Sequence, residues 1–211
     1  MTNSPGPKER TLDLFKDKMR GGGARPNLFE CELYFPTESI PIETTEAILS
    51  ETTRFLVKAA NLPASTLGII DVPFRGRNLK IAGDRTFDPW TITVINDSDF
   101  LIRTAFERWM NLINKHQDAA GKTNPIEYQQ DVYVKQFGRA SVKGSSPPKS
   151  DAAIPVLKQY KFYGVFPTSV SAIDLSYDSS DTIEEFTVDL QVQWWDALDE
   201  DGRSQLGTLE T

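Results

Sequence analysis

Apolar and polar residues alternate with a period of two from residue 185 to residue 194. The apolar positions are Phe186, Val188, Leu190, Val192 and Trp194, and the polar positions are Glu185, Thr187, Asp189, Gln191 and Gln193. Side chains of a β-strand point alternately to opposite faces, so this pattern predicts a strand with one buried face and one wet face. The same period marks residues 28–35 and 90–96 and predicts two further half-buried strands.

Shorter β-prone runs and turn signals occupy much of the remaining chain. Further strands are expected at residues 53–60, 69–72, 78–81, 126–137, 156–166 and 170–177. Glycine and proline favour turns, so we expect turns at Arg75-Gly76 and Gly83-Asp84 and a strand break at Phe166-Pro167. Residues 36–52 carry two prolines and favour a loop with one helical turn near residues 45–49.

A helical period replaces the β period in two segments. Residues 11–20 place Leu12, Phe15 and Met19 at helical spacing ahead of Gly21-Gly22-Gly23, which predicts a short amphipathic helix and then a hinge. Residues 100–115 follow a group of good N-cap side chains over residues 96–99. Their apolar stripe predicts a helix across the sheet or barrel end and consists of Ile102, Phe106, Trp109, Leu112 and Ile113.

These elements together predict a mainly β fold. We expect a β-barrel or sandwich of two packed antiparallel sheets, with one long flanking α-helix and a short N-terminal helix. The 211 residues suit one decorated domain. The expected division is an N-terminal arm over 1–23, a β-barrel domain over 24–196 with loop insertions near 36–52 and 138–155, and a C-terminal tail over 197–211. The hinge would let the arm contact another subunit.

Composition and charge narrow the function classes. With 39% hydrophobic and 25% charged residues, the chain is ordinary for a globular protein. No apolar run approaches the roughly 18 residues of a membrane span, and the start lacks the apolar core of a secretion signal. We therefore expect no stable membrane insertion. The net charge of -7 argues against a protein that grips nucleic acid, because such binding uses clustered Lys and Arg.

Residues that could carry chemistry are few. The chain has one cysteine, Cys31, and one histidine, His116, which cannot form the usual nitrogen and sulfur zinc site. Cys31 lies in an alternating stretch and is expected in the core, and His116 at the polar end of a helix. The carboxylates Asp178, Asp181, Glu184 and Glu185 match no calcium loop and favour a solvated hairpin. We expect no enzyme activity and no cofactor, and a carboxylate metal site stays open.

Charged residues around the two predicted glycine turns favour contacts between elements or between subunits. Arginine and carboxylate side chains in such turns suit bidentate ion pairs, within one subunit or between two. The candidate subunit-interface residues are Arg75, Arg77, Asp84, Arg85 and Asp88.

Several segments, in order, resemble the tail tube protein of contractile-tailed, myovirus-type bacteriophages. They are ARPNLFECEL, KIAGDRTFDPWTITVIND, IEYQQDVYVKQFGR, YGVFPTSVSAIDLSYDS and EEFTVDLQVQWW, which span most of residues 24–196. Residues 36–52, residues 141–155 and the tail beyond Asp196 depart from the family pattern. The resemblance implies a virion protein, synthesised in the host cytoplasm, whose hexameric rings stack into a hollow tube inside a contractile sheath.

In this family the genome passes down the lumen when the sheath contracts. The implied partners are further copies of the chain, the sheath protein, and the baseplate and tail terminator proteins, with DNA only as non-specific passing cargo. An acidic lumen would not retain DNA, so the polar face of the 185–194 strand is a candidate lumen lining. Its residues are Glu185, Thr187, Asp189, Gln191 and Gln193, and the alternative is that this face points outward.

Two other functions stay open at this stage. A tube-like protein of a baseplate hub or of a bacterial contractile secretion system would share the fold. A monomeric β-barrel that binds a small ligand would also bury aromatic residues and show alternation. The tube protein is favoured because the resemblance runs almost end to end without an appended domain.

Overall fold

The structure is a computed structural model that describes residues 12–19, 23–139, 155–198 and 203–205. Most of the predicted glycine hinge, residues 140–154 of the predicted insertion and most of the predicted C-terminal tail lie outside the described residues. Helix α1 (Leu12–Lys18) confirms the amphipathic helix expected over residues 11–20.

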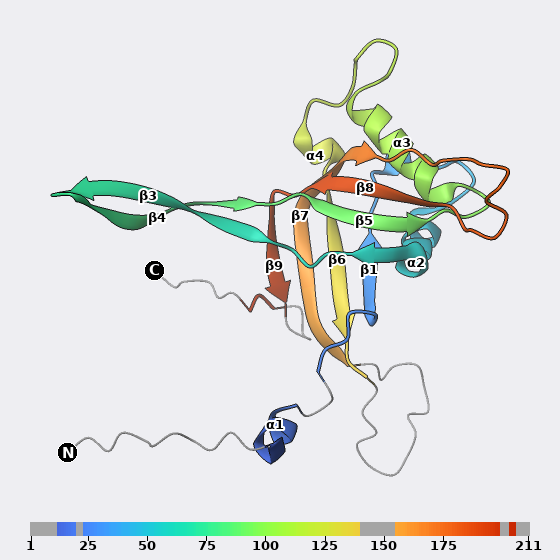
Figure 1. The fold of residues 1–211 in the computed structure, drawn as a ribbon. Coiled ribbons are helices and arrows are strands. Elements are labelled where there is room, and N and C mark those ends of the chain that lie inside the picture. The colour runs from blue at the N-terminus through green and yellow to red at the C-terminus, as the bar shows by residue number, and fades with distance from the viewer. Residues whose placement is uncertain (1–11, 20–22, 140–154, 199–202, 206–211) are drawn as a thin grey trace.

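Antiparallel strands form the main body of the fold (Figure 1). After α1 the elements are β1 (Phe29–Leu33), the 3-10 helix η2 (Thr37–Ser39), α2 (Glu46–Leu56), β2 (Val57–Ala60), β3 (Ser65–Phe74), β4 (Arg77–Phe87), β5 (Trp90–Ile95), α3 (Leu101–Ile113), α4 (Pro125–Tyr128), β6 (Gln130–Phe137), β7 (Val156–Val170), β8 (Glu185–Gln191) and β9 (Trp194–Leu198). The mainly β fold predicted from the sequence is confirmed.

Strand β7 connects two layers of the barrel. Its first part pairs with β6 and β9, and its last part pairs with β8. The strand path is β1-β6-β7-β8-β5-β2, and every pair in it is antiparallel. In Figure 1 the layer of β8, β5 and β2 crosses the layer of β1, β6, β7 and β9. A long strand shared by two crossing layers is how orthogonally packed sheets turn a corner.

The core lies between these layers. Trp90, Ile92 and Val94 of β5 are buried, whereas Thr91 and Thr93 between them are partly exposed, which confirms the predicted alternation. Trp90 stacks on Phe162 of β7 with ring centroids 4.6 Å apart. The buried face of β8 adds Phe186, Val188 and Leu190. Cys31 is fully buried in this core, as predicted.

Helix α3 packs its apolar stripe into the same core. The N-cap residue is Phe100, which has a left-handed backbone and no side-chain cap, so the N-cap expected over residues 96–99 is wrong. The carboxylate of Asp97 still accepts a hydrogen bond of 3.1 Å from the backbone N–H of Leu101 in the first turn. Phe106 and Trp109 contact Phe35 edge-to-face at centroid distances of 5.1 and 5.6 Å. Ile102 and Ala105 complete the buried stripe.

The helical turn expected near residues 45–49 is confirmed as the start of α2, but the loop expected after it, to residue 52, is wrong because α2 continues there. The helix continues to Leu56 through Thr52, which lay in the expected loop, and Thr53, which began the expected strand. Both are β-branched residues of lower helix propensity. The hydroxyls of Thr52 and Thr53 donate to the carbonyls of Ile48 and Ser50, both at 2.7 Å, which reconciles them with helical backbone. Only β2 remains of the strand expected over residues 53–60.

The expected ends of the C-terminal strands also need correction. Pro167 does not break β7, because a register shift between Pro167 and Ser169 accommodates the missing N–H. Residues 171–177, expected as strand, lie after β7 ends at Val170. The strand expected through Trp194 is divided into β8 and β9. β9 includes Ala197 and Leu198, which pair with β7 and are buried although we assigned them to the tail.

Candidate assembly surfaces

Strands β3 and β4 form a long hairpin that projects from the barrel (Figure 1). Arg75 and Gly76 connect the strands as a two-residue turn, with φ angles of 45° and 82°. Positive φ at both central residues is typical of the tight turn that matches the twist of a hairpin, and glycine adopts it without strain. The predicted turn at Arg75-Gly76 is therefore confirmed, but the strands on either side are far longer than predicted.

The predicted turn at Gly83-Asp84 is wrong, because both residues lie within β4. Gly83 faces Gly68 across the hairpin, at a register shift between Leu67 and Ile69. A β-carbon on Gly83 would lie 3.2 Å from both the carbonyl carbon and the oxygen of Gly68. The glycine therefore serves close approach of two backbones and does not reverse the chain.

One face of the hairpin is apolar. Ile70 lies opposite Ile81, and Val72 lies opposite Leu79, so these side chains share one face with Phe74, which lies opposite Arg77 at the tip. All five are exposed, with accessible fractions between 38% and 66%. The opposite face carries Asp71 and Lys80, which form an exposed ion pair at 3.7 Å. We call Ile70, Val72, Phe74, Leu79 and Ile81 the apolar hairpin face.

The predicted interface residues all lie on or directly after this hairpin. Arg75 and Arg77 are at its tip, Asp84 and Arg85 lie near its base in β4, and Asp88 follows β4. All are exposed. The structure thus separates them into two groups along the hairpin. Sequence reasoning missed the apolar hairpin face, although pairing the strands outward from the Arg75-Gly76 turn would have revealed it.

The predicted lumen-facing residues lie on the polar face of β8, with one exception. Glu185, Thr187, Asp189 and Gln191 point away from the core, whereas Gln193 lies between β8 and β9. The hydroxyl of Thr91 donates a hydrogen bond of 2.6 Å to Asp189 Oδ1. Lys58 of β2 contacts Glu185 at 2.5 Å. The polar face thus extends from β8 across β5 to β2.

A charged cluster that sequence reasoning missed covers the outer face of β1. Lys135 Nζ lies 2.8 Å from Glu32 Oε2, and Arg54 Nη2 lies 2.5 Å from Glu32 Oε1. The Tyr34 hydroxyl also donates to Glu32 at 2.8 Å. Burial alone would raise the pKa of Glu32, but the hydrogen bonds from Lys135, Tyr34 and Arg54 outweigh it and lower the pKa to about 2. The only sequence pattern that could have revealed this cluster is the position of Glu30 and Glu32 on either side of Cys31, which places both glutamates on the outer face of the strand.

The residues considered for chemistry lie apart from one another. Burial raises the pKa of the Cys31 thiol to about 12, with a smaller contribution from Glu30, so the thiol is unreactive near neutral pH. His116 is exposed just beyond the end of α3. Among the described residues, no group of three or more His, Cys, Asp or Glu side chains is placed to hold a metal ion. No helix in the described part of the chain is long and apolar enough to cross a membrane.

The family assignment follows from comparison with known proteins. The family model described as phage tail tube protein matches residues 24–197. The tail tube protein gp19 of Enterobacteria phage T4 is 32% identical over 176 residues, which cover 83% of this chain and 93% of the relative. The tail tube protein of Serratia phage KSP90 is 28% identical over 183 residues, which cover 86% of this chain and 93% of the relative.

Solved structures share the fold at much lower identity. A chain in the cryo-EM structure of the anti-feeding prophage cap, described as its tube terminating cap, matches with a TM-score of 0.54 and 14% identity over 83% of this chain and 90% of that chain. A chain of the anti-feeding prophage baseplate matches with a TM-score of 0.53 and 13% identity over 83% of this chain and 95% of that chain. The fold, the family match and the identity to tube proteins agree, and the chain belongs to the phage tail tube protein family.

Proposed function

We propose that this chain forms hexameric rings that stack into the tube of a contractile phage tail, inside a sheath and around a lumen that passes the genome. As a tail tube protein it is a structural component of the virion tail. The observation that supports the stacked assembly is the apolar hairpin face, which no described part of the chain covers. A two-stranded hairpin by itself is marginally stable in water, so this one requires a partner.

The free energy gained on association should come mainly from the apolar hairpin face and less from the charged residues of the hairpin. Fully burying an aliphatic or aromatic side chain contributes roughly 1.5 to 3 kcal/mol, and these side chains are about half exposed. Each therefore offers about 1 kcal/mol on further burial. An exposed ion pair such as Asp71 with Lys80 contributes about 0 to 1 kcal/mol. The charged residues of the hairpin are better suited to fixing orientation than to providing affinity.

Lateral contacts within a ring would use the sheet edges. Strands β1 and β2 are the two ends of the strand path, so each has one side without a neighbouring strand in the described part of the chain. Unpaired backbone donors and acceptors at such edges favour pairing with another copy. Six copies joined in this way would form a continuous inner barrel.

The polar face of β8, β5 and β2 is the proposed lining of the lumen. Its carboxylate Asp189, which has no basic partner among the described ion pairs, repels phosphates, whereas Lys58 neutralises Glu185. The net charge of -7 has the same sign as Asp189. DNA would therefore pass as non-specific cargo without being retained. The opposite orientation, with this face towards the sheath, is the alternative that the Asp189 variant described below is designed to exclude.

The remaining parts of the proposal concern partners and setting. Chains with the same fold occur in the cap and the baseplate of the anti-feeding prophage, which supports terminator and baseplate proteins as neighbours of this tube. The sheath protein would surround it. We further propose that the chain is synthesised in the host cytoplasm, has no enzymatic activity and does not insert stably into a membrane.

Electron microscopy of the purified protein tests this function. We expect rings with six subunits at moderate concentration and stacked tubes at higher concentration. Light scattering after size-exclusion chromatography provides the mass of the ring. A protein that stays monomeric at high concentration, in the way expected of a ligand-binding β-barrel, would contradict the proposal.

A further inference from the structure

The loop between β7 and β8 combines acidic and apolar residues in an unusual way. Residues 171–184, SAIDLSYDSSDTIE, contain Asp174, Asp178, Asp181 and Glu184 and no basic residue. Leu175, Tyr177 and Ile183 are largely exposed among these carboxylates. A solvated hairpin was expected here, but solvation alone does not explain three large apolar side chains held in water. We call residues 171–184 the acidic loop.

The acidic loop is anchored at both ends. Arg103 of α3 donates a hydrogen bond of 3.2 Å to the carbonyl of Ser171. At the other end, the backbone N–H and the side-chain amide of Asn96 donate to the backbone carbonyl and the carboxylate of Glu184, each at 2.9 Å. Between these anchors the loop curves around an open concavity of about 660 Å³, lined by Ile173, Tyr177 and Ile183 together with polar residues such as Thr182. The loop therefore presents a hollow that an apolar side chain can enter.

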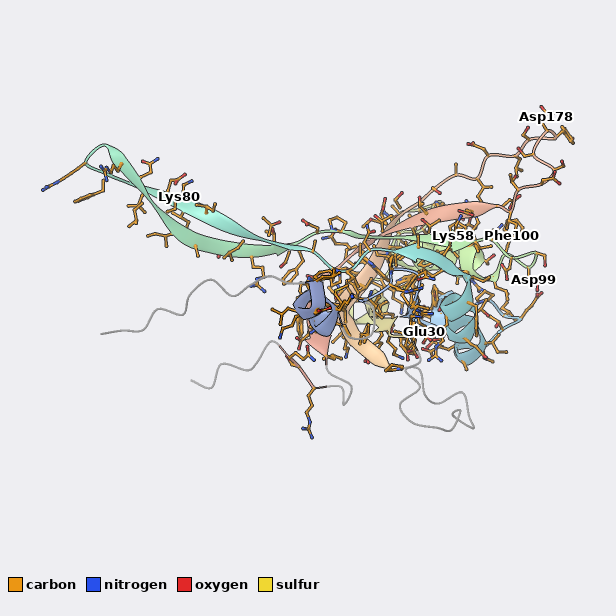
Figure 2. All side chains as sticks on the ribbon, turned by 60° about the horizontal axis from the view of Figure 1, so that its bottom comes forward. Glu30, Lys58, Lys80, Asp99, Phe100 and Asp178 are labelled. Atoms are coloured by element: carbon orange, nitrogen blue, oxygen red, sulfur yellow. The ribbon has the colours of Figure 1, made fainter. Side chains whose placement is uncertain are left out.

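The acidic loop and the hairpin lie at opposite ends of the molecule. The hairpin leads into β5 just before Trp90, whereas the acidic loop leads into β8 at Glu185, which pairs with Ile95 at the far end of β5. Figure 2 shows Lys80 of the hairpin and Asp178 of the loop on opposite sides of the barrel. A chain that stacks head-to-tail needs two different, complementary surfaces at opposite ends, and these two satisfy that requirement.

The two surfaces are also complementary in chemistry. Arg75 and Arg77 give the hairpin tip two positive charges, and no ion pair among the described residues involves either of them. Phe74, beside them, is exposed and its ring lies under the Arg75 guanidinium at 5.3 Å. The acidic loop offers carboxylates around exposed apolar groups. Charge complementarity of this kind fixes register, while buried aromatic anchors supply affinity.

We propose that the acidic loop receives the hairpin tip of a second copy in the adjacent ring. Phe74 enters the hollow of the loop, and Arg75 and Arg77 face Asp174, Asp178 and Asp181. This inference rests on the proposed stacking of rings, and it adds the surface that receives the hairpin.

Engineered cysteines test the contact directly. Cys31 is fully buried with a raised pKa, so the natural thiol does not compete in oxidation of the folded protein. A chain with both Arg75→Cys and Asp178→Cys should give, after oxidation of assembled tubes, a ladder of trimers and larger covalent species on a non-reducing gel. Either change alone can give only dimers, and Arg75→Cys with Asp118→Cys, on the exposed connection after α3, should give no ladder. Tubes that yield no ladder from the first pair would overturn the proposal.

Exchanging the charges of the two surfaces tests the contact independently. The double variant Asp178→Arg, Asp181→Arg and the double variant Arg75→Glu, Arg77→Glu should each lose tubes while keeping the far-UV spectrum of the fold. Combining all four changes in one chain should restore tubes, because the exchanged charges are complementary again. A loop variant that forms tubes of normal length would contradict the contact. Failure of the unmodified protein to form rings or tubes would instead contradict the proposed function, so the two failures are distinguishable.

Discussion

The hydroxyl of Thr91 on β5 donates a hydrogen bond of 2.6 Å to the carboxylate of Asp189 on β8, and the two residues are direct partners in the sheet. This bond holds a negative charge in a defined place on the polar face. The charge is partly exposed and has no basic partner among the described ion pairs. Asp189 is therefore the best residue for testing whether DNA passes along this face.

Replacing Asp189 with Lys should leave tube assembly intact and reduce infectivity. The lost hydrogen bond costs about 0.5 to 1.5 kcal/mol, which a folded domain tolerates. A lysine in the lumen would attract phosphates with about 1 kcal/mol per close contact in water, and every subunit would repeat it. Tube length in micrographs and infectivity of phage carrying the variant are the measurements. The matched control is Asp118→Lys, and equal infectivity of both variants would show that this face does not line the lumen.

Replacing Leu79 with Asp should abolish tubes without destabilising the subunit. The leucine belongs to the apolar hairpin face and is more than half exposed, so the change should alter the free energy of unfolding by about 0.5 kcal/mol or less. In an assembly it would place a charge in an apolar contact, which costs several kcal/mol. Sedimentation and micrographs measure assembly, and urea unfolding of the unassembled subunit measures stability.

The control for Leu79 is its neighbour. Asn78→Asp introduces the same residue one position away, on the opposite face of the hairpin, where Asn78 pairs with Pro73. It should leave tubes largely intact, because that face already carries Asp71 and Lys80. If both variants lost tubes equally, the face of the hairpin would not matter and negative charge alone would explain the loss.

Replacing Gly83 with Ala should weaken the hairpin selectively. The added β-carbon would meet backbone atoms of Gly68 at 3.2 Å, and backbone cannot turn aside as a side-chain end can. We expect fewer and shorter tubes, with an unchanged urea midpoint for the barrel, since the hairpin adds nothing to the core. Gly138→Ala is the control, because the atoms nearest to its β-carbon would be side-chain atoms of Leu157 and Pro155, not backbone. A normal tube yield from Gly83→Ala would contradict the role of the close approach.

The same glycine illustrates how far sequence reasoning reaches. Periods of two and of 3.6 residues identified β5, β8 and α3 correctly, because in each of them burial decides which side chains face inward. We predicted a turn at Gly83 because glycine is common both in turns and at close contacts between backbones. The strand register, which places Gly68 opposite Gly83, is needed to tell the two cases apart. The strand start expected at Thr53 was also wrong, because the hydroxyls of Thr52 and Thr53 donate to helix carbonyls and the helix continues to Leu56.

The candidate surfaces were also predictable to different degrees, because some depend on local sequence and others on which strands pair. Arg75 and Arg77 stand next to a recognisable turn, so a charged tip was visible in the sequence. The apolar hairpin face becomes visible only when the strands are paired outward from that turn, because Val72 and Leu79 become neighbours only through pairing. The Glu32 cluster likewise joins β1, α2 and β6, which lie far apart in the chain. Contacts of this kind follow from topology, which local patterns do not specify.

Replacing Glu32 with Gln should lower stability at neutral pH and remove part of its acid dependence. The pKa of Glu32 lies below its ordinary value of 4.5, at about 2, so the carboxylate stabilises the fold fully above pH 4.5 and loses this contribution as pH falls towards 2. At 1.36 kcal/mol per unit, a shift from 4.5 to about 2 corresponds to about 3 to 4 kcal/mol, which solvent screening at this partly accessible site lowers to roughly 2 to 3 kcal/mol. In urea unfolding of unassembled subunits, the free energies of unfolding of wild type and variant should differ by that amount at pH 7 and become nearly equal near pH 2.

The control is Glu107→Gln, which alters the more exposed ion pair with Arg103 and should lower the free energy of unfolding by about 0.5 kcal/mol or less. If the difference in free energy of unfolding between wild type and Glu32→Gln stayed constant with pH, the shape of the side chain, and not its ionised carboxylate, would account for the effect.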